Sequence, residues 1–408
     1  MKLHLRAASA LALLSLALTA CKTDTPAVAV TPAVTAVSPD AGLAAGGTTV
    51  TVTGSNFKAG VSVKFGATLS STVNVLSATT LTAISPAAGN AGKVDITVSD
   101  GNATSPASSA DQFGYLAFTE YPITTANSTP EGIAAGPDGN LWFTEYAANK
   151  IGRITPAGTV TEFPITSAAS GAVSIAAGPD GNLWFTEYGA NKIGRITPAG
   201  VITEFPVKTA ASGPQNIAAG PDGNLWFTEY AANKIGTITP AGTVVEYPVP
   251  TAKSSLVGIT AGPDGNLWFT ENDGNKIGRI TPAGAVTEFP ITTANSNPLG
   301  IAAGPDGNLW FTEYAANKIG RITPAGSVTE FPITTAGSFP QGIVSGPDGN
   351  LWFTEFQNNK IGRMTPTGAV TDFPVTTASG NPLGVAAGPD GNLWFTEYNG
   401  NKIGVLKR

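Results

Sequence analysis

The sequence predicts an all-β protein made of a small N-terminal unit and a long array of repeats. Three observations support this prediction. The ten residues GPDGNLWFTE occur seven times at a spacing of 42 residues. Gly and Pro make up about a fifth of the chain, which favours short strands and tight turns over helices. Between Gly46 and Gly101, short segments alternate Thr or Val with other residues at a period of two, as half-buried strands do.

The first residues have the pattern of an export signal and not of a folded element. Lys2 and Arg6 precede an apolar run of secretory length, which is too short for a convincing membrane span. We therefore expect residues 1–20 to be a signal peptide. The run ends in the letters LTAC, with the cysteine at position 21, and this motif resembles the lipobox of bacterial lipoproteins.

That resemblance implies a lipid on Cys21, which would become the first mature residue and hold the protein on a membrane. Lys22 after the cysteine favours the outer membrane in a cell that has one. Residues 21–30 would form a short flexible tether. An ordinary secretory signal with a chance cysteine is the alternative.

The supply of cysteine and histidine limits the possible chemistry. Cys21 is the only cysteine and His4 the only histidine, and His4 would leave with the signal peptide. This excludes Ser-His-Asp and Cys-His catalysis, thiolate or histidine zinc sites, and disulfides in the mature chain. Without Lys2 and Arg6 the chain has 20 basic and 28 acidic residues, a formal net charge of −8. We therefore expect no nucleic-acid partner.

Residues 31–115 predict a small β-sandwich. The segments GGTTVTVTGSNF, VSVKFG and KVDITVSDG alternate with the period of strands and stop at turn-forming residues. Their order, from VSPDAGLAAGG through VKFG to LTAISPAAGNAGKVDITVSDG, resembles the IPT/TIG family of immunoglobulin-like domains. The resemblance implies a spacer or a binding module, and we favour a spacer.

From residue 116 onward, the 42-residue period predicts a β-propeller of seven four-stranded blades. The wealth of Gly and Pro argues against helical repeats of similar length. In the first repeat we expect strands A to D over residues 132–136, 141–146, 150–155 and 159–165. The seven tryptophans occupy the same place in every repeat, and Trp and Phe of strand B would fill the space between blades.

The two ends of the array complement each other. The last repeat stops after strand C at NKIGVLKR, whereas residues 116–123, LAFTEYPI, form a strand D that precedes the first blade. Pairing these segments would close the ring and leave no blade without its outer strand. We therefore predict a seven-bladed propeller over residues 116–408, closed by the strand 116–123.

A glutamate ends strand B in every repeat, on the face that the B–C and D–A loops share. These residues are Glu145, Glu187, Glu229, Glu271, Glu313, Glu355 and Glu397. One interpretation is a ring of cross-strand pairs with basic residues such as Lys150 and Arg153. The other is a carboxylate-rich mouth that binds a cation. We favour the pairs, because identical blades offer no distinct site.

Differences between the repeats are the better guide to a binding site. After strand B the fourth repeat has Asn272-Asp273-Gly274, whereas the other repeats have an aromatic residue there. The candidate ligand-binding aromatics are Tyr146, Tyr188, Tyr230, Tyr314, Phe356 and Tyr398. An aromatic, partly apolar mouth suits a peptide, a glycan or other cell-wall material. Packing between neighbouring loops would explain the same residues.

The line GPDGNLWFTEYAANKIGRITPAGTVTEFPI resembles the blade repeat of the virginiamycin B lyase (streptogramin lyase) family, and the resemblance extends over residues 116–408. It implies a seven-bladed propeller. For the family's enzyme it implies opening of a cyclic depsipeptide at its ester by elimination, with magnesium and a histidine base. The family's catalytic histidines follow a proline just before strand A. The matching residues here are Glu131, Val173, Gln215, Val257, Leu299, Gln341 and Leu383.

None of these seven residues is a histidine, which puts the base in doubt. Glu131 is the one ionisable residue among them and is the candidate for a substituted base. A metal-binding glutamate two residues before the base is also missing, since Thr129 and its equivalents are not acidic. In the family, the other metal ligand is a glutamate at the end of strand B. The candidates for binding Mg²⁺ are therefore Glu145 and Glu397, and Glu397 is the best match to the family's last blade.

We expect a lipid-anchored protein of the outer membrane or cell surface whose propeller is a binding or interaction module without catalytic histidines. The alternative is an enzyme that resembles streptogramin lyase and uses a substituted base. A purely structural envelope protein is a third possibility.

Overall fold

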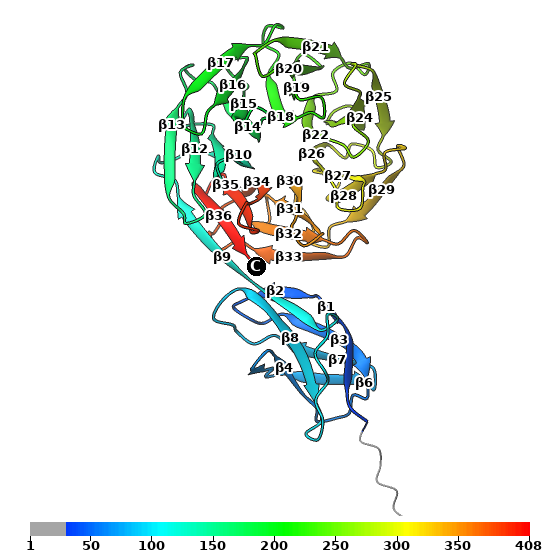
Figure 1. Cartoon of the computed structure of the whole chain (residues 1–408). Coiled ribbons are helices and arrows are strands. Elements are labelled where there is room, and N and C mark those ends of the chain that lie inside the picture. The colour runs from blue at the N-terminus through cyan, green and yellow to red at the C-terminus, as the bar shows by residue number, and fades with distance from the viewer. Residues whose placement is uncertain (1–29) are drawn as a thin grey trace, which may run out of the picture.

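The computed structural model describes residues 30–408 as strands and turns without helices, so the predicted all-β class is confirmed (Figure 1). Within this range no helix is long and apolar enough to cross a membrane. The predicted signal peptide, Cys21 and all but the last residue of the tether lie outside the described residues. The described chain has two parts, an N-terminal sandwich and a ring of sheets.

The N-terminal part is a sandwich, as its alternating segments predict. One sheet has the order β1 (Ala33–Ser38), β3 (Thr49–Ser55), β7 (Thr80–Ile84) and β6 (Val73–Ser77). The other contains β5 (Thr68–Leu69), β4 (Ser62–Phe65), β8 (Gly92–Ser99) and the start of β9 (Gln112–Pro122), with β2 (Ala41–Leu43) parallel to β9. Between the sheets, Val52 and Leu81 share a buried core with Phe113.

The rest of the chain forms seven four-stranded sheets around a central axis (Figure 1). In each sheet the strands run antiparallel, and the first strand lies nearest the axis. We keep the names strand A to strand D for this order. The first sheet is β10 (Pro130–Ala135), β11 (Leu141–Glu145), β12 (Lys150–Ile154) and β13 (Val160–Pro164).

Five further sheets repeat this order along the chain. The second and third are β14 (Ala172–Ala177), β15 (Leu183–Glu187), β16 (Lys192–Ile196), β17 (Ile202–Pro206), and β18 (Pro214–Ala219), β19 (Leu225–Glu229), β20 (Lys234–Ile238), β21 (Val244–Pro248). The fourth and fifth are β22 (Leu256–Ala261), β23 (Leu267–Glu271), β24 (Lys276–Ile280), β25 (Val286–Pro290), and β26 (Pro298–Ala303), β27 (Leu309–Glu313), β28 (Lys318–Ile322), β29 (Val328–Pro332). The sixth is β30 (Pro340–Ser345), β31 (Leu351–Glu355), β32 (Lys360–Met364) and β33 (Val370–Pro374). The seventh is β34 (Pro382–Ala387), β35 (Leu393–Glu397), β36 (Lys402–Lys407) and β9.

Strand B supplies the packing between neighbouring sheets. Its side chains alternate between the two faces, so Trp142 points to the next sheet and shares a buried cluster with Leu183 and Phe185. Phe143 points the other way and shares a cluster with Trp394 of the seventh sheet. The prediction that Trp and Phe fill the space between blades is therefore confirmed.

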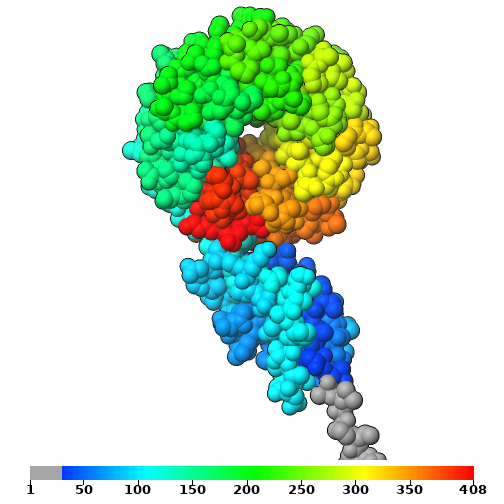
Figure 2. Space-filling view, in the orientation of Figure 1, coloured from blue at the N-terminus to red at the C-terminus, as the bar shows by residue number. Residues whose placement is uncertain are grey.

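A threonine next to the end of strand B ties each sheet to the next. The Thr144 hydroxyl accepts a hydrogen bond from the Gly132 N–H and donates one to the Val173 carbonyl of the second sheet, both at 2.9 Å. In the seventh sheet the Thr396 hydroxyl donates to the Glu131 carbonyl of the first sheet at 2.7 Å. Because β10 also lies against β34, the last sheet is joined directly to the first around the opening visible in Figure 2.

Strand β9 belongs to both parts of the molecule. Its residues 112–115 pair with β8 of the sandwich, and its residues 117–122 pair with β36 of the seventh sheet. The strand predicted over 116–123 therefore begins earlier, at Gln112, because the last strand of the sandwich continues without a break into the ring. An ion pair between Asp40 and Arg363 joins the two parts a second time.

Candidate functional site

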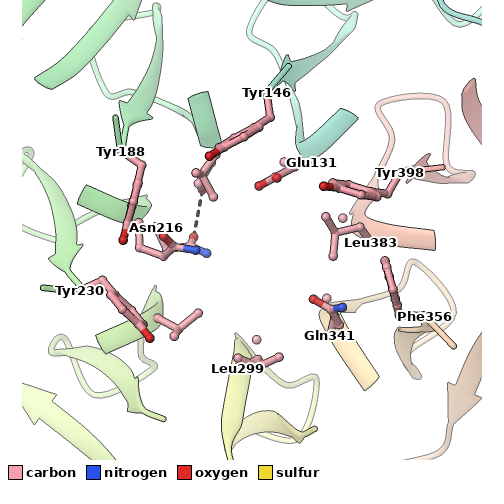
Figure 3. Close-up of a pocket in the computed structure, with 18 of the residues that line it drawn as sticks. Glu131, Tyr146, Tyr188, Asn216, Tyr230, Leu299, Gln341, Phe356, Leu383 and Tyr398 are labelled. Carbon is pink, nitrogen blue, oxygen red and sulfur yellow. Dashed lines mark hydrogen bonds between the residues drawn. The ribbon is translucent and has the colours of Figure 1, made fainter. Parts of the chain in front are cut away.

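A central cavity lies on the axis of the ring, where the inner strands begin (Figure 3). Its volume is about 780 Å³, which is within the range of sites for small organic ligands. Two sets of residues line it, one at the start of strand A and one in the loop after strand B. Each repeat therefore contributes from the same two places, and the identity of those residues decides what the cavity can bind.

The first set contains all seven positions that match the family's histidines. Near each of them strand A shifts its register against strand B, as it does between Pro130 and Ile133. This irregularity lies where the strand starts at the axis. The seven residues are Glu131, Val173, Gln215, Val257, Leu299, Gln341 and Leu383. All seven therefore line the cavity, which has a carboxyl, two amides and four aliphatic side chains there.

The second set contains five of the six predicted aromatics. Tyr146, Tyr188, Tyr230, Phe356 and Tyr398 line the cavity, together with Asn272 of the fourth repeat. Tyr314 is not among the lining residues and packs instead on the ring of Phe339, with 4.8 Å between the ring centroids. Some of the lining rings also contact each other, since the Tyr188 and Tyr230 centroids lie 6.4 Å apart. Loop packing and a cavity wall are thus both roles of this aromatic set.

Sequence reasoning missed the residue that follows each of these seven positions. It is glycine in five repeats, but Ser174 and Asn216 occupy it in the second and third. Both line the cavity, and the Ser174 hydroxyl is 2.9 Å from the Asn216 side-chain oxygen (Figure 3). A comparison of the repeats at this position, like the one made at its neighbours, would have found them.

Glu131 is the only carboxyl group that lines the cavity. Burial raises its pKa to about 7. Tyr146 and Tyr398 lie on either side of it (Figure 3). Burial also raises the pKa of the Tyr398 hydroxyl, and the negative charge of Glu131 adds to that effect. A carboxyl group with a pKa near neutrality can hold or release a proton at physiological pH.

The glutamates that end strand B do not form a mouth. Each of the seven, including Glu145 and Glu397, has no exposed surface, and none lines the cavity. Burial raises the pKa of Glu145 to about 7, and the charge of Glu162 adds to this effect. The prediction of an open carboxylate ring is therefore wrong, because the loops after strand B cover these side chains.

The predicted pairs of these glutamates with lysine and arginine are also wrong. Lys150 lies opposite Glu145 in the strand register, but its ammonium group binds Glu162 of strand D at 2.7 Å. The guanidinium of Arg153 lies 5.4 Å from the Trp142 ring centroid and donates to the Pro198 carbonyl of the next sheet at 3.0 Å. Strand D thus supplies the acidic partner that we assigned to strand B.

The residues present do not fit a magnesium ion. Among residues 30–408 no group of three or more His, Cys, Asp or Glu side chains is placed to hold a metal. Glu145 and Glu397, the two candidates, are sealed from the cavity, and Glu131 is alone in it. Mg²⁺ prefers an octahedral set of oxygen ligands, which a single carboxyl group does not provide.

Comparisons with known proteins agree with the fold. A sequence profile of the virginiamycin B lyase family matches residues 75–295 and 256–408, and a profile of the IPT/TIG domain matches residues 32–115. No curated protein matches the chain.

Solved structures give the same result. A streptogramin B lyase structure is 39% identical, with a TM-score of 0.69, and the match covers 72% of this chain and 97% of that one. A catalytically inactive histidine-to-alanine variant of virginiamycin B lyase from Staphylococcus aureus, solved with quinupristin, is 41% identical, with a TM-score of 0.69 and coverage of 72% and 99%. An auxiliary nutrient binding protein from Bacteroides ovatus, 15% identical with a TM-score of 0.50, shares the fold over 93% of this chain and 98% of its own. The chain belongs to the virginiamycin B lyase family and carries an IPT/TIG domain before its propeller.

Proposed function

We propose that this protein is an exported, lipid-anchored protein of the cell envelope whose propeller binds a ligand in its central cavity. The basic start, the apolar run and the LTAC motif ending at Cys21 support export and lipid attachment. The sandwich places the propeller away from the anchor, since the described chain enters the sandwich first and reaches the ring only through β9 (Figure 1).

The observation on which the binding role rests is the composition of the cavity wall. The cavity is lined by the seven positions that the resemblance assigns to the family's histidines and has a size suited to a small organic ligand, but none of these positions holds a histidine. No other described residue supplies an imidazole, because the chain's single histidine is His4. Binding without the family's chemistry is the function that this combination favours.

The wall also indicates the kind of ligand. Five aromatic rings supply flat apolar surfaces, and Gln215, Asn216 and Gln341 supply amide donors and acceptors. Aliphatic residues such as Leu299 and Leu383 complete the wall. A short peptide or a glycan of cell-wall origin offers the matching mixture of apolar faces and hydrogen-bonding groups.

Calorimetric titration with a panel of cell-wall peptides, glycan oligomers and quinupristin tests this function. We expect at least one compound to bind with one site per chain and to lose about tenfold in affinity in the double variant Tyr146→Ala with Tyr398→Ala. Tyr314→Ala is the matched control, because Tyr314 has the same place in its repeat but lies outside the cavity. Binding that is insensitive to the double variant would count against the cavity.

A second candidate function is favoured by Glu131. Its pKa of about 7 would let its carboxylate take a proton from carbon at neutral pH. In an elimination, the ester C–O bond would then break, the carboxylate of the substrate would leave and a C=C bond would form. The enzyme would have to work without the family's histidine, and the residues here do not offer the metal site either. A linear product that forms with the wild type and is lost in Glu131→Gln would support this alternative.

The anchor has its own test. A radiolabelled fatty acid supplied to expressing cells should label the wild-type protein and should not label Cys21→Ser. The variant should also be released from membranes. Label that persists in Cys21→Ser would exclude the lipid at this residue.

A further inference from the structure

The carboxyl group of Glu131 is unusual because it has no partner. Among residues 30–408 it makes no ion pair and no side-chain hydrogen bond, although its backbone carbonyl accepts one from Thr396. The outer carboxylates of the ring differ, as Glu162 shows: it binds the ammonium of Lys150 and the hydroxyl of Thr125 at 2.7 Å each. Glu131 also differs from the sealed strand-B glutamates, because it opens into the cavity.

An unpaired carboxylate in a partly desolvated site is costly, and a cation from outside relieves that cost. The cavity wall has no lysine or arginine that could do so. The protein's net charge of −6 over the whole chain also favours the approach of cations. The missing partner of Glu131 is therefore most naturally supplied by a ligand.

The surroundings of Glu131 specify which cation. Tyr146 and Tyr398 flank it (Figure 3), and the faces of aromatic rings attract ammonium groups. Leu299 across the cavity and Leu383 beside Tyr398 offer apolar surface (Figure 3). A metal ion such as Mg²⁺ needs several oxygen ligands, and the cavity lining has one carboxyl group. An ammonium group can be bound by one carboxylate and the faces of aromatic rings, which the lining does provide.

We infer that the cavity selects ligands that carry a single organic ammonium group beside an apolar body, with Glu131 and the rings of Tyr146 and Tyr398 holding the ammonium. This inference rests on the proposed binding function and names its ligand class. Basic peptides and amino sugars belong to this class, whereas neutral peptides and N-acetylated glycans do not.

A matched pair of peptides tests the inference. Acetyl-Leu-Phe-Lys-amide and its analogue with an acetylated lysine side chain differ in charge but share the same body. They are titrated calorimetrically at about pH 8, where the Glu131 carboxylate is ionised. We expect the charged peptide to bind about tenfold more tightly, and Glu131→Gln to remove that preference while binding of the acetylated peptide stays the same.

A relocated carboxylate provides the control for misfolding. In the double variant Glu131→Gln with Gln215→Glu, a carboxyl group again lines the cavity, at the equivalent position of the third repeat. We expect it to restore preference for the charged peptide. Equal affinities in the wild type, a preference that survives Glu131→Gln, or no binding of either peptide at millimolar concentration would overturn the inference. Equal affinities that still depend on Tyr146 and Tyr398 would overturn it while leaving the binding function in place.

Discussion

At the scale of single residues, the glutamates that end strand B are buried carboxyl groups whose pKa values are raised. Burial raises the pKa of Glu187 to about 8, and the charge of Glu204 adds to that rise. Burial alone would raise the pKa of Glu204 too, but hydrogen bonds from Lys192 and Ser167 bring it below its ordinary value. In the second repeat, strand B therefore carries a neutral carboxyl group, Glu187, and strand D carries an ionised one, Glu204, which binds Lys192.

This arrangement predicts that the free energy of unfolding falls as the pH rises from about 5 to about 8. The folded-state pKa of Glu187, about 8, lies above its ordinary value of 4.5, so the folded chain binds more protons in that window. The stabilisation is complete below 4.5 and disappears as the pH passes about 8. Glu187→Gln mimics the neutral acid and should reduce this loss by about 1–3 kcal/mol.

Urea unfolding of wild type and variant at both ends of the window measures this effect. Asp180→Asn is the control, because its carboxylate has a pKa below the ordinary value, is already ionised in this window, and accepts a hydrogen bond from the Trp184 indole at 3.0 Å. It should lower stability without making it less dependent on pH between 5 and 8. Wild-type stability that is constant or rises with pH would contradict the protonated state of Glu187.

Gly152 is a second residue-scale test. A Cβ atom at Gly152 would overlap the ring of Phe143, which fills the space between two sheets. Gly152→Ala should therefore destabilise the protein by about 1–3 kcal/mol. A Cβ atom at Gly89 meets nothing nearby, so Gly89→Ala should change the thermal unfolding midpoint little. Equal midpoints for the two variants would show that the ring of Phe143 can move away.

Residue-level prediction from the sequence succeeded where repeats differ and failed where they agree. Glu131 and its equivalents in the other repeats stood out because they vary in an otherwise constant frame, and they line the cavity. Lys150 has two acidic neighbours, Glu145 in strand B and Glu162 in strand D, and the sequence does not say which one its ammonium reaches. Burial of Glu145 under a loop was equally invisible, because it depends on how the loop folds back.

At the scale of elements, the strand-B threonines join neighbouring sheets near the axis. Thr144→Val keeps the shape of the side chain but removes the hydroxyl that serves both the Gly132 N–H and the Val173 carbonyl. We expect a loss of about 1–3 kcal/mol in the free energy of unfolding, because two half-buried polar groups lose a partner. The control is Thr161→Val on the exposed side of β13, which should have little effect. Equal unfolding curves would mean that the bridge contributes nothing measurable.

Strand β9 shows where element prediction reached its limit. The sequence indicated only an outer strand of the ring over residues 116–123, and that part pairs with β36 as expected. Its continuation back to Gln112 as one strand was not predicted, because Gly114 interrupts the segment and the boundary between the two parts was expected at residue 116. The contact of Asp40 with Arg363 was also unpredictable, since it joins residues that are distant in sequence and occurs once.

At the scale of the whole molecule, a nearly uniform ring encloses a cavity that is not uniform. The fold could be predicted because seven identical segments at a fixed spacing must form equivalent units, and packing then follows from Trp and Phe on opposite faces of strand B. The cavity lining combines the single carboxyl group of Glu131 with aliphatic side chains such as Leu299 and Leu383 and with the amide of Gln341 (Figure 3). We propose that this cavity binds a ligand and does not perform the family's elimination.

Incubation of the mature chain with quinupristin and Mg²⁺, followed by mass spectrometry, tests that claim most directly. A virginiamycin B lyase treated in parallel shows that the conditions allow the reaction. Because the positions of the family's base hold no histidine, we predict that quinupristin stays intact even at high protein concentration. A linear elimination product that forms with the wild type and disappears with Glu131→Gln would contradict the account.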